Sequence, residues 1–229
     1  MKGYNDPRME KYFTASTFKG NPWVGLRSGI TVPKKDWALA YAAPNFPASD
    51  LSLMWMNAAE VSFLRAEGAW RGWAMGGTPE FFYKQGIERS FEQYGLSGAD
   101  DYANDSTLKP ADYADPNKDY SYSIKARTDV TIKWAEDGRE LERIMTQKWI
   151  AIYPLGQEAW SEIRRTGYPK VFPSQTNRSG GVLPSGATIR RVPLPQQEYD
   201  GNAEQVAKAV NEFLGGSDNC AQKLWWDAK

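Results

Sequence analysis

The stretch LSLMWMNAAEVSFLRAEGAWRGW, residues 51–73, has the strongest helical pattern in the chain. One face of this helix carries five residues at steps of four, three, four and three: Met56, Glu60, Phe63, Glu67 and Trp70. Two carboxylates therefore lie on an apolar stripe, where an unpaired charge would be costly. We expect Glu60 and Glu67 either to pair with arginines as structural anchors or to act as catalytic acids.

Further helices follow along the chain. Thr78 and Pro79 are typical of a helix start, and the helix that they open ends near Gly95. This helix and the helix of residues 51–73 form an antiparallel hairpin. A capping box from Asp137 to Glu140 opens a third helix, which Pro154 and Gly156 break. Its inner face is predicted to hold Leu141, Ile144, Met145, Lys148, Trp149 and Ile152.

A fourth helix over residues 157–166 completes a second hairpin, and a last helix is capped by Asn202. Val206, Ala209, Val210 and Phe213 form the apolar face of the last helix. Alternation over 128–134 predicts a short strand. The sequence thus predicts a mainly α fold, built of helix hairpins of the tetratricopeptide type with long irregular loops.

We interpret the whole chain, residues 1–229, as one domain with three parts. Residues 1–50 are loop-rich, residues 51–166 hold the helix hairpins with a long insert at 95–137, and residues 167–229 are irregular apart from the C-terminal helix. The opening MKGYNDPRMEKYF is typical of the middle of a protein, so we expect a fragment.

The composition excludes several kinds of function. Lys and Arg number 28 against 28 Asp and Glu, which argues against a nucleic-acid partner. Histidine is absent, and Cys220 is the single cysteine, so the usual general base, the commonest zinc ligand and an internal disulfide are missing. No apolar run is long enough to span a bilayer. We expect no metal and no cofactor.

Aromatic residues make up 14% of the chain, and several lie in loops. Trp23, Arg27, Trp37 and Tyr41 fall in the irregular first part, where they either pin the loop down or present flat faces to a ligand. Further candidates in the long insert are Tyr113, Tyr120 and Tyr122. Asp115, Asn117 and Asp119 begin like a calcium loop, but the required glycine and glutamate are replaced by Tyr120 and Ala126, so we reject that motif.

Arg164 and Arg165 are the simplest partners for Glu60 and Glu67, because arginine binds a carboxylate through two parallel hydrogen bonds. We therefore predict a structural ion-pair network of these four residues. The alternative is a glycosidase pair, but seven residues along a helix separate the two carboxylates by about 10 Å, which is slightly wide. We expect no catalytic residue here.

Five segments together resemble the C-terminal half of the SusD/RagB family: EVSFLRAEGAWRGWAMGG, YKQGIERSFEQYG, LERIMTQKWIAIYPLGQEAWSEIRRTGYP, IRRVPLPQQEYDGN and GGSDNCAQKLWWDAK. They occur in the order of the family and cover nearly all of the chain from Asn5 onward. By this resemblance, Glu60, Arg65, Glu67 and the pair Arg164 and Arg165 belong to the helical scaffold.

The resemblance implies an outer-membrane lipoprotein of the cell surface that binds glycans, or sometimes peptides, and passes them to a TonB-dependent, SusC-like transporter. It implies a binding protein and not an enzyme, with the lipid anchor outside this fragment. Two other functions stay open: a helical scaffold that contacts the transporter without binding sugar, and, more remotely, a carbohydrate-active enzyme.

Overall fold

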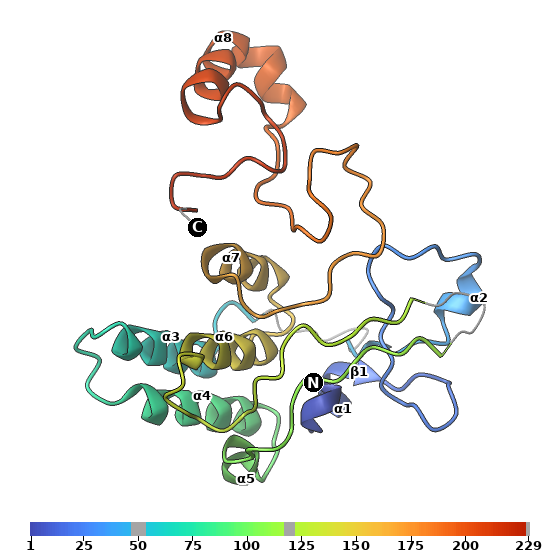
Figure 1. Cartoon of the computed structure of the whole chain (residues 1–229), viewed down its shortest axis with the longest axis vertical. Coiled ribbons are helices and arrows are strands. Elements are labelled where there is room, and N and C mark those ends of the chain that lie inside the picture. The colour runs from blue at the N-terminus through green and yellow to red at the C-terminus, as the bar shows by residue number, and fades with distance from the viewer. Residues whose placement is uncertain (47–53, 117–121, 228–229) are drawn as a thin grey trace. The chain divides into compact units, whose positions relative to one another are not determined.

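The computed structural model describes residues 1–46, 54–116 and 122–227 (Figure 1). The chain divides into two compact units. The first consists of Met1–Leu26 and Thr31–Phe172, and the second of Arg27–Ile30 and Pro173–Lys229. Among the described residues the first unit carries nearly all helices, so the prediction of a mainly helical chain with tetratricopeptide-like hairpins is confirmed.

Helices α3, Ala58–Trp70, and α4, Pro79–Gln93, form the first hairpin and lie side by side in Figure 1. The Thr78 hydroxyl caps α4 as predicted, accepting a hydrogen bond from the Phe81 amide at 3.1 Å. The start of α3 differs from the prediction. Asn57 caps it through the Glu60 amide at 2.7 Å, so Met56 precedes the helix and is 62% exposed.

The apolar stripe predicted on this first helix is therefore shorter than expected. Phe63 is buried, but Trp70 at the C-terminal end of α3 is exposed. Phe63 is buried because α3 and α4 approach each other closely at this point. A Cβ atom on Gly86 of α4 would lie 2.7 Å from the Phe63 ring. Glycine at this position lets the aromatic ring of one helix rest on the backbone of the other.

Helices α6, Glu140–Ala151, and α7, Gly156–Thr166, form the second hairpin. The predicted capping box is wrong in detail, because the N-cap residue is Arg139. Asp137 instead accepts two hydrogen bonds from Arg143, at 2.6 and 2.8 Å. The prediction that Trp149 faces inward is also wrong, since its side chain is 36% exposed while its helix neighbours Lys148 and Ile150 are buried.

The first unit also contains shorter elements. They are the 3-10 helix η1, Lys2–Tyr4; helices α1, Met9–Tyr12, α2, Lys35–Ala38, and α5, Ala99–Ala103; and strands β1, Phe13–Thr14, and β2, Ala43–Pro44. The two strands pair antiparallel, with Phe13 opposite Pro44 and Thr14 opposite Ala43.

The strand predicted over residues 128–134 is not formed. Val130, Ile132 and Trp134 do alternate into the core, which produced the strand-like pattern. Tyrosine hydroxyls satisfy two of the backbone carbonyls. Tyr4 donates to the Val130 carbonyl at 2.8 Å and Tyr83 to the Ile132 carbonyl at 2.5 Å. The segment is therefore extended but has no strand ladder. It is held by these side-chain hydrogen bonds and by a backbone bond, from the Lys133 amide to the Asp105 carbonyl at 2.9 Å.

The second unit contains α8, Gln196–Phe213, which is kinked at Asn202. Two helical segments meet at Asn202, whose backbone angles are non-helical, so the predicted start of the last helix coincides with the kink. A further helical segment, from Gln196 onward, precedes it and was not expected. Val206 of the predicted apolar face is buried, whereas Phe213 is largely exposed. Two ion pairs hold the unit, Arg190 with Asp227 and Arg191 with Asp218.

A buried ion-pair network joins α3, α6 and α7. Lys148, whose residue is 0% exposed, lies with its Nζ atom 2.7 Å from Glu162 and 3.4 Å from both Glu60 and Glu158. Arg165 donates two hydrogen bonds of 2.6 Å to Glu67 and a third of 2.6 Å to Glu162. Since Glu162 contacts both cations, the pairs form one continuous chain.

The predicted network and the observed one overlap in part. The structure brings Glu67 and Arg165 together, but it pairs Glu60 with Lys148. The Arg164 guanidinium lies 3.5 Å over the ring of Trp160. Burial alone would raise the pKa of Glu67, but hydrogen bonds from Arg165 and Arg71 outweigh it and lower that pKa. For Glu60, burial prevails over the attraction of Lys148 and raises the pKa.

Replacing the buried cation tests whether the network holds the hairpins together. We expect Lys148→Met to lower the free energy of unfolding by about 3–5 kcal/mol, because it leaves Glu60 buried without its cation. Lys84→Met is the matched control, since Lys84 forms an exposed pair with Glu80 at 2.9 Å, and there we expect a loss of about 0.2–0.5 kcal/mol. Urea unfolding measures both, and similar losses for the two variants would contradict the role given to Lys148.

The lowered pKa of Glu67 predicts a pH dependence. The stabilisation from its ion pairs is complete above the ordinary glutamate pKa of 4.5 and is lost as the pH falls through the lower pKa of the folded state. Glu67→Gln should therefore be less stable than the parent at pH 7, by about 1–3 kcal/mol since Arg165 is partly exposed, and this difference should shrink in acid. Unfolding curves from pH 7 to pH 3 measure it, and a constant difference would count against it.

Candidate functional site

The loops of the first unit rest on a set of backbone hydrogen bonds that tie distant segments together. Beyond the β1–β2 pair, the Ala42 amide donates to the Val24 carbonyl at 2.8 Å, and the Thr17 amide donates to the Ala40 carbonyl at 2.9 Å. Residues 13–25 and 40–45 thus lie side by side. This arrangement gives the aromatic residues of the loops a fixed backbone, even though the elements are short.

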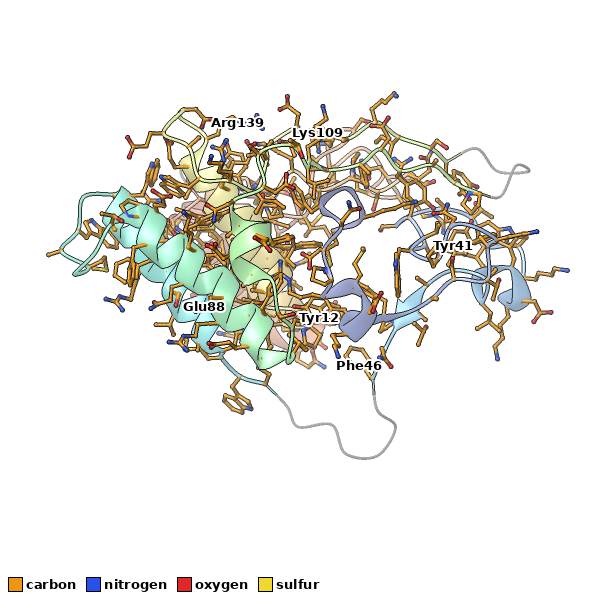
Figure 2. All side chains as sticks on the ribbon, turned by 90° about the horizontal axis from the view of Figure 1, so that it is seen from below. Tyr12, Tyr41, Phe46, Glu88, Lys109 and Arg139 are labelled. Carbon is orange, nitrogen blue, oxygen red and sulfur yellow. The ribbon has the colours of Figure 1, made fainter. Side chains whose placement is uncertain are left out.

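Tyr41 is the centre of an aromatic cluster on this backbone (Figure 2). Its residue is 3% exposed. The Phe18 ring meets it edge-on at 5.0 Å, and the Trp37 ring lies tilted against it, also at 5.0 Å between centroids. A ring that is covered in this way offers no free face for stacking. Tyr41 therefore supports its neighbours, and the half-buried Trp37 is the ring of the pair that is open in part to solvent.

The Tyr41 hydroxyl donates a hydrogen bond of 2.7 Å to Asp115 in the long insert. Burial, followed by this hydrogen bond to a carboxylate, raises the pKa of Tyr41 well above its usual range. The hydroxyl therefore remains a protonated donor even at a pH where an ordinary tyrosine, with a pKa of about 10, would ionise. Nothing in the sequence around Asp115 identifies this partner, which lies 74 residues away along the chain.

The part of the insert that holds Asp115 is a short hairpin-like segment. Tyr113 and Ile124 exchange two backbone hydrogen bonds of 2.9 Å, and the Asp115 amide donates to the Ser123 hydroxyl at 3.1 Å. Asp112 accepts from Lys125 at 2.6 Å. We call residues 112–116 and 122–126 the insert arm. Its Asp115 reaches the loop cluster, while Tyr113 lies 6.2 Å from the Phe172 ring.

Three of the four predicted ligand residues lie in the first unit, and the fourth lies in the second. Trp37 and Tyr41 lie in contact, and Trp23 is half-buried in the segment beside Ala42. Arg27 belongs to the second unit, where its guanidinium donates to the Pro173 carbonyl at 3.4 Å. Of the further candidates, Tyr113 and Tyr122 are half-buried in the insert arm, and Tyr120 lies outside the described residues.

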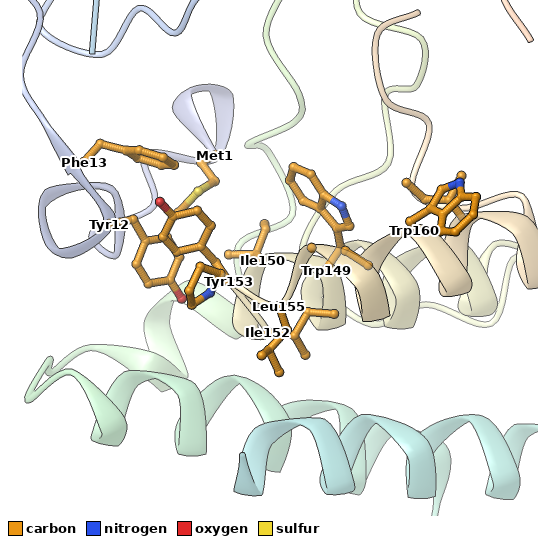
Figure 3. Close-up of a pocket in the computed structure, with 13 residues that line it drawn as sticks. Met1, Tyr12, Phe13, Trp149, Ile150, Ile152, Tyr153, Leu155 and Trp160 are labelled. Carbon is orange, nitrogen blue, oxygen red and sulfur yellow. The ribbon is translucent and has the colours of Figure 1, made fainter. Parts of the chain in front are cut away.

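A separate pocket of about 370 Å³ lies between α1, α6 and α7 (Figure 3). Trp149, Tyr153 and Trp160 contribute to its walls, and Tyr153 stacks on Tyr12 with 4.7 Å between ring centroids. Among the residues that the structure describes, none of those lining the pocket has a charged side chain. A sugar needs hydrogen-bond partners for its hydroxyl groups, so this lining suits an apolar group better than a glycan.

The described residues provide little for catalysis or metal binding. Glu60 and Glu67, the one carboxylate pair considered for glycoside hydrolysis, are buried and bound to cations, so neither faces a substrate. Within residues 1–46, 54–116 and 122–227, no group of three or more His, Cys, Asp or Glu could hold a metal ion. In the same part of the chain, the helices are all too short or too polar to cross a membrane.

Comparison with solved structures gives close matches over the full chain. A SusD homologue from Bacteroides uniformis has 47% sequence identity and a TM-score of 0.94, and the match covers 100% of this chain and 48% of that one. A chitin-binding SusD homologue from Flavobacterium johnsoniae has 44% identity and a TM-score of 0.91, with 100% and 48% covered. A homologue from Bacteroides thetaiotaomicron has 42% identity and a TM-score of 0.91, with 100% and 50% covered.

The chain thus spans about half the length of the solved structures it matches. A search of curated proteins finds no match. The family model described as SusD-like, Susd and RagB outer membrane lipoprotein, matches residues 1–227. The resemblance seen in the sequence is confirmed, and this chain belongs to the SusD/RagB family of outer-membrane lipoproteins.

Proposed function

We propose that this chain is part of a cell-surface glycan-binding protein that holds a polysaccharide or oligosaccharide for uptake by a TonB-dependent, SusC-like transporter. It acts by binding and carries out no chemical step. The observation that carries the proposal is the presence of two half-buried tryptophans, Trp23 and Trp37, on loops tied by backbone hydrogen bonds. The buried ring of Tyr41 lies against Trp37.

The chemistry of these residues fits a sugar. The C–H faces of a pyranose ring are apolar and stack on flat aromatic surfaces, while its hydroxyl groups need hydrogen-bond partners. Tryptophan offers the largest such surface. Its side chain loses little conformational freedom on binding when the backbone that carries it is already fixed. Arg27 remains a separate prediction, as a hydrogen-bond donor of the second unit.

Chitin oligosaccharides are the first ligands to test. The homologue from Flavobacterium johnsoniae, 44% identical over the whole of this chain, is named as chitin-binding. A glycan of this kind has pyranose faces for the tryptophans and amide groups for polar partners. A panel of other soluble polysaccharides in affinity gels extends the test to other glycans.

Replacing the tryptophans tests the site. We expect Trp23→Ala and Trp37→Ala each to weaken the binding of chitohexaose about two- to tenfold, because each removes about 0.5–1.5 kcal/mol of stacking. Trp225→Ala is the control, since that side chain is 92% exposed and belongs to the second unit. Isothermal titration calorimetry gives the affinities. If the Trp23→Ala/Trp37→Ala double variant binds every tested glycan as the parent does, the site lies elsewhere.

The second candidate function is a helical scaffold that contacts the transporter without binding sugar. Phe213 and Trp225 favour it, because large apolar side chains so exposed often mark protein contacts. For a scaffold, the Phe213→Ser/Trp225→Ser variant should lose co-purification with a co-expressed TonB-dependent transporter, and the parent should bind no glycan. Glycan binding that depends on Trp23 and Trp37 would instead support the first proposal.

A further inference from the structure

One hydrogen bond joins two parts of the first unit that are remote in sequence. The Tyr41 hydroxyl donates to the Asp115 Oδ1 atom at 2.7 Å, across 74 residues of chain. Tyr41 belongs to the loop that carries Trp37, and Asp115 belongs to the insert arm. The bond therefore connects the insert arm to the aromatic cluster.

Both ends of this hydrogen bond are held independently. On the loop side, the rings of Phe18 and Trp37 enclose Tyr41, and the next amide, that of Ala42, is bonded to Val24. On the insert side, the Tyr113–Ile124 pair and the bond from Asp115 to Ser123 fix the backbone around the carboxylate. The hydrogen bond between Tyr41 and Asp115 thus joins two segments that are each held in place, and it contributes to fixing their relative position.

The contact is also chemically suited to hold a position. A hydrogen bond to a carboxylate is shorter and stronger than one between neutral groups. The tyrosine ring is buried, so a lost acceptor would leave its hydroxyl without a partner away from water. The raised pKa of Tyr41 agrees with this, because it keeps the hydroxyl protonated as a donor.

We propose that Asp115 is a positioning residue for glycan binding: it fixes Tyr41, and through the Tyr41 ring it holds Trp37 in the orientation that stacks on the sugar. The proposal rests on the function proposed above. Asp115 does not contact the glycan. It determines how well the Trp37 ring is ordered before the glycan arrives, and this order lowers the entropic cost of binding.

Five variants of the 229-residue chain test the proposal with chitohexaose in calorimetry. Asp115→Ala removes the acceptor, and Tyr41→Phe removes the donor while keeping the ring. The Asp115→Ala/Tyr41→Phe variant combines the two changes, and Asp115→Asn keeps an acceptor oxygen. Asp112→Asn is the matched control, since Asp112 lies in the same insert arm but pairs with the exposed Lys125. Circular dichroism and thermal unfolding establish that each variant folds.

We expect Asp115→Ala and Tyr41→Phe each to bind about tenfold more weakly, the effect of losing one hydrogen bond to a charged group. The double variant should bind no more weakly than Asp115→Ala, because the hydrogen bond that Tyr41→Phe removes is already absent there. Asp115→Asn should bind within about threefold of the parent, since it still accepts from the hydroxyl. Asp112→Asn should bind as the parent does.

Amide hydrogen exchange gives a second readout that needs no ligand. In Asp115→Ala we expect faster exchange in both joined parts, residues 37–42 and the insert arm, with the rates of α3 and α4 unchanged. Parent-like affinity in Asp115→Ala and Tyr41→Phe, with weakened binding by Trp37→Ala, would overturn the positioning role and leave the proposed function standing. A parent chain that binds no glycan would overturn both.

Discussion

The fold of the first unit depends on one buried cation. Lys148 of α6 meets Glu60 of α3 and Glu162 of α7 in a place that water does not reach. Apolar helix faces can slide or rotate with little loss of contact, but a lysine among carboxylates has one good position. Removing Lys148 would leave Glu60 without its cation in the interior. We read the network as the feature that sets the register of the three helices, with packing supplying most of the stabilisation.

A second buried ion pair, between Arg8 and Asp6, links the loops of the first unit to the helix hairpins. Arg8, which is fully buried, binds Asp6 at 2.6 Å and also donates to Ser90 of α4 and Gln147 of α6. It thereby anchors the start of α1 to the helical hairpins. Strand β1 follows α1 directly, and its pairing with β2 begins the set of hydrogen bonds that places Tyr41. The aromatic loop is therefore connected to the helix core through a short, fixed path.

The sequence predicts those features of the fold that depend on nearby residues. The hairpin helices follow from their period, and the cap at Thr78 follows from local chemistry. The sequence does not identify Lys148 as the partner of Glu60. Lys148 lies on the apolar face of α6, and the helical period of that face is set by its apolar residues, so the period says nothing about what a lysine on it would bind. The alternation of apolar and polar residues over 128–134 predicts a strand, but in the structure it reflects burial alone. Tyrosine hydroxyls bind the Val130 and Ile132 carbonyls, which a neighbouring strand would otherwise satisfy.

The same distinction applies to the candidate site. Composition and loop position select Trp23, Trp37 and Tyr41, but they do not separate an open ring from a supporting one. The degree of burial distinguishes the supporting ring of Tyr41 from the more open ring of Trp37. Tyr41 is covered by Phe18 and bound by Asp115, which is remote in sequence. A buried tyrosine hydroxyl needs an acceptor, so a tyrosine fixed within an irregular loop implies a second segment that supplies one. In this chain the insert arm supplies the acceptor, through Asp115. This hydrogen bond explains why the long polar insert lies against the aromatic loop.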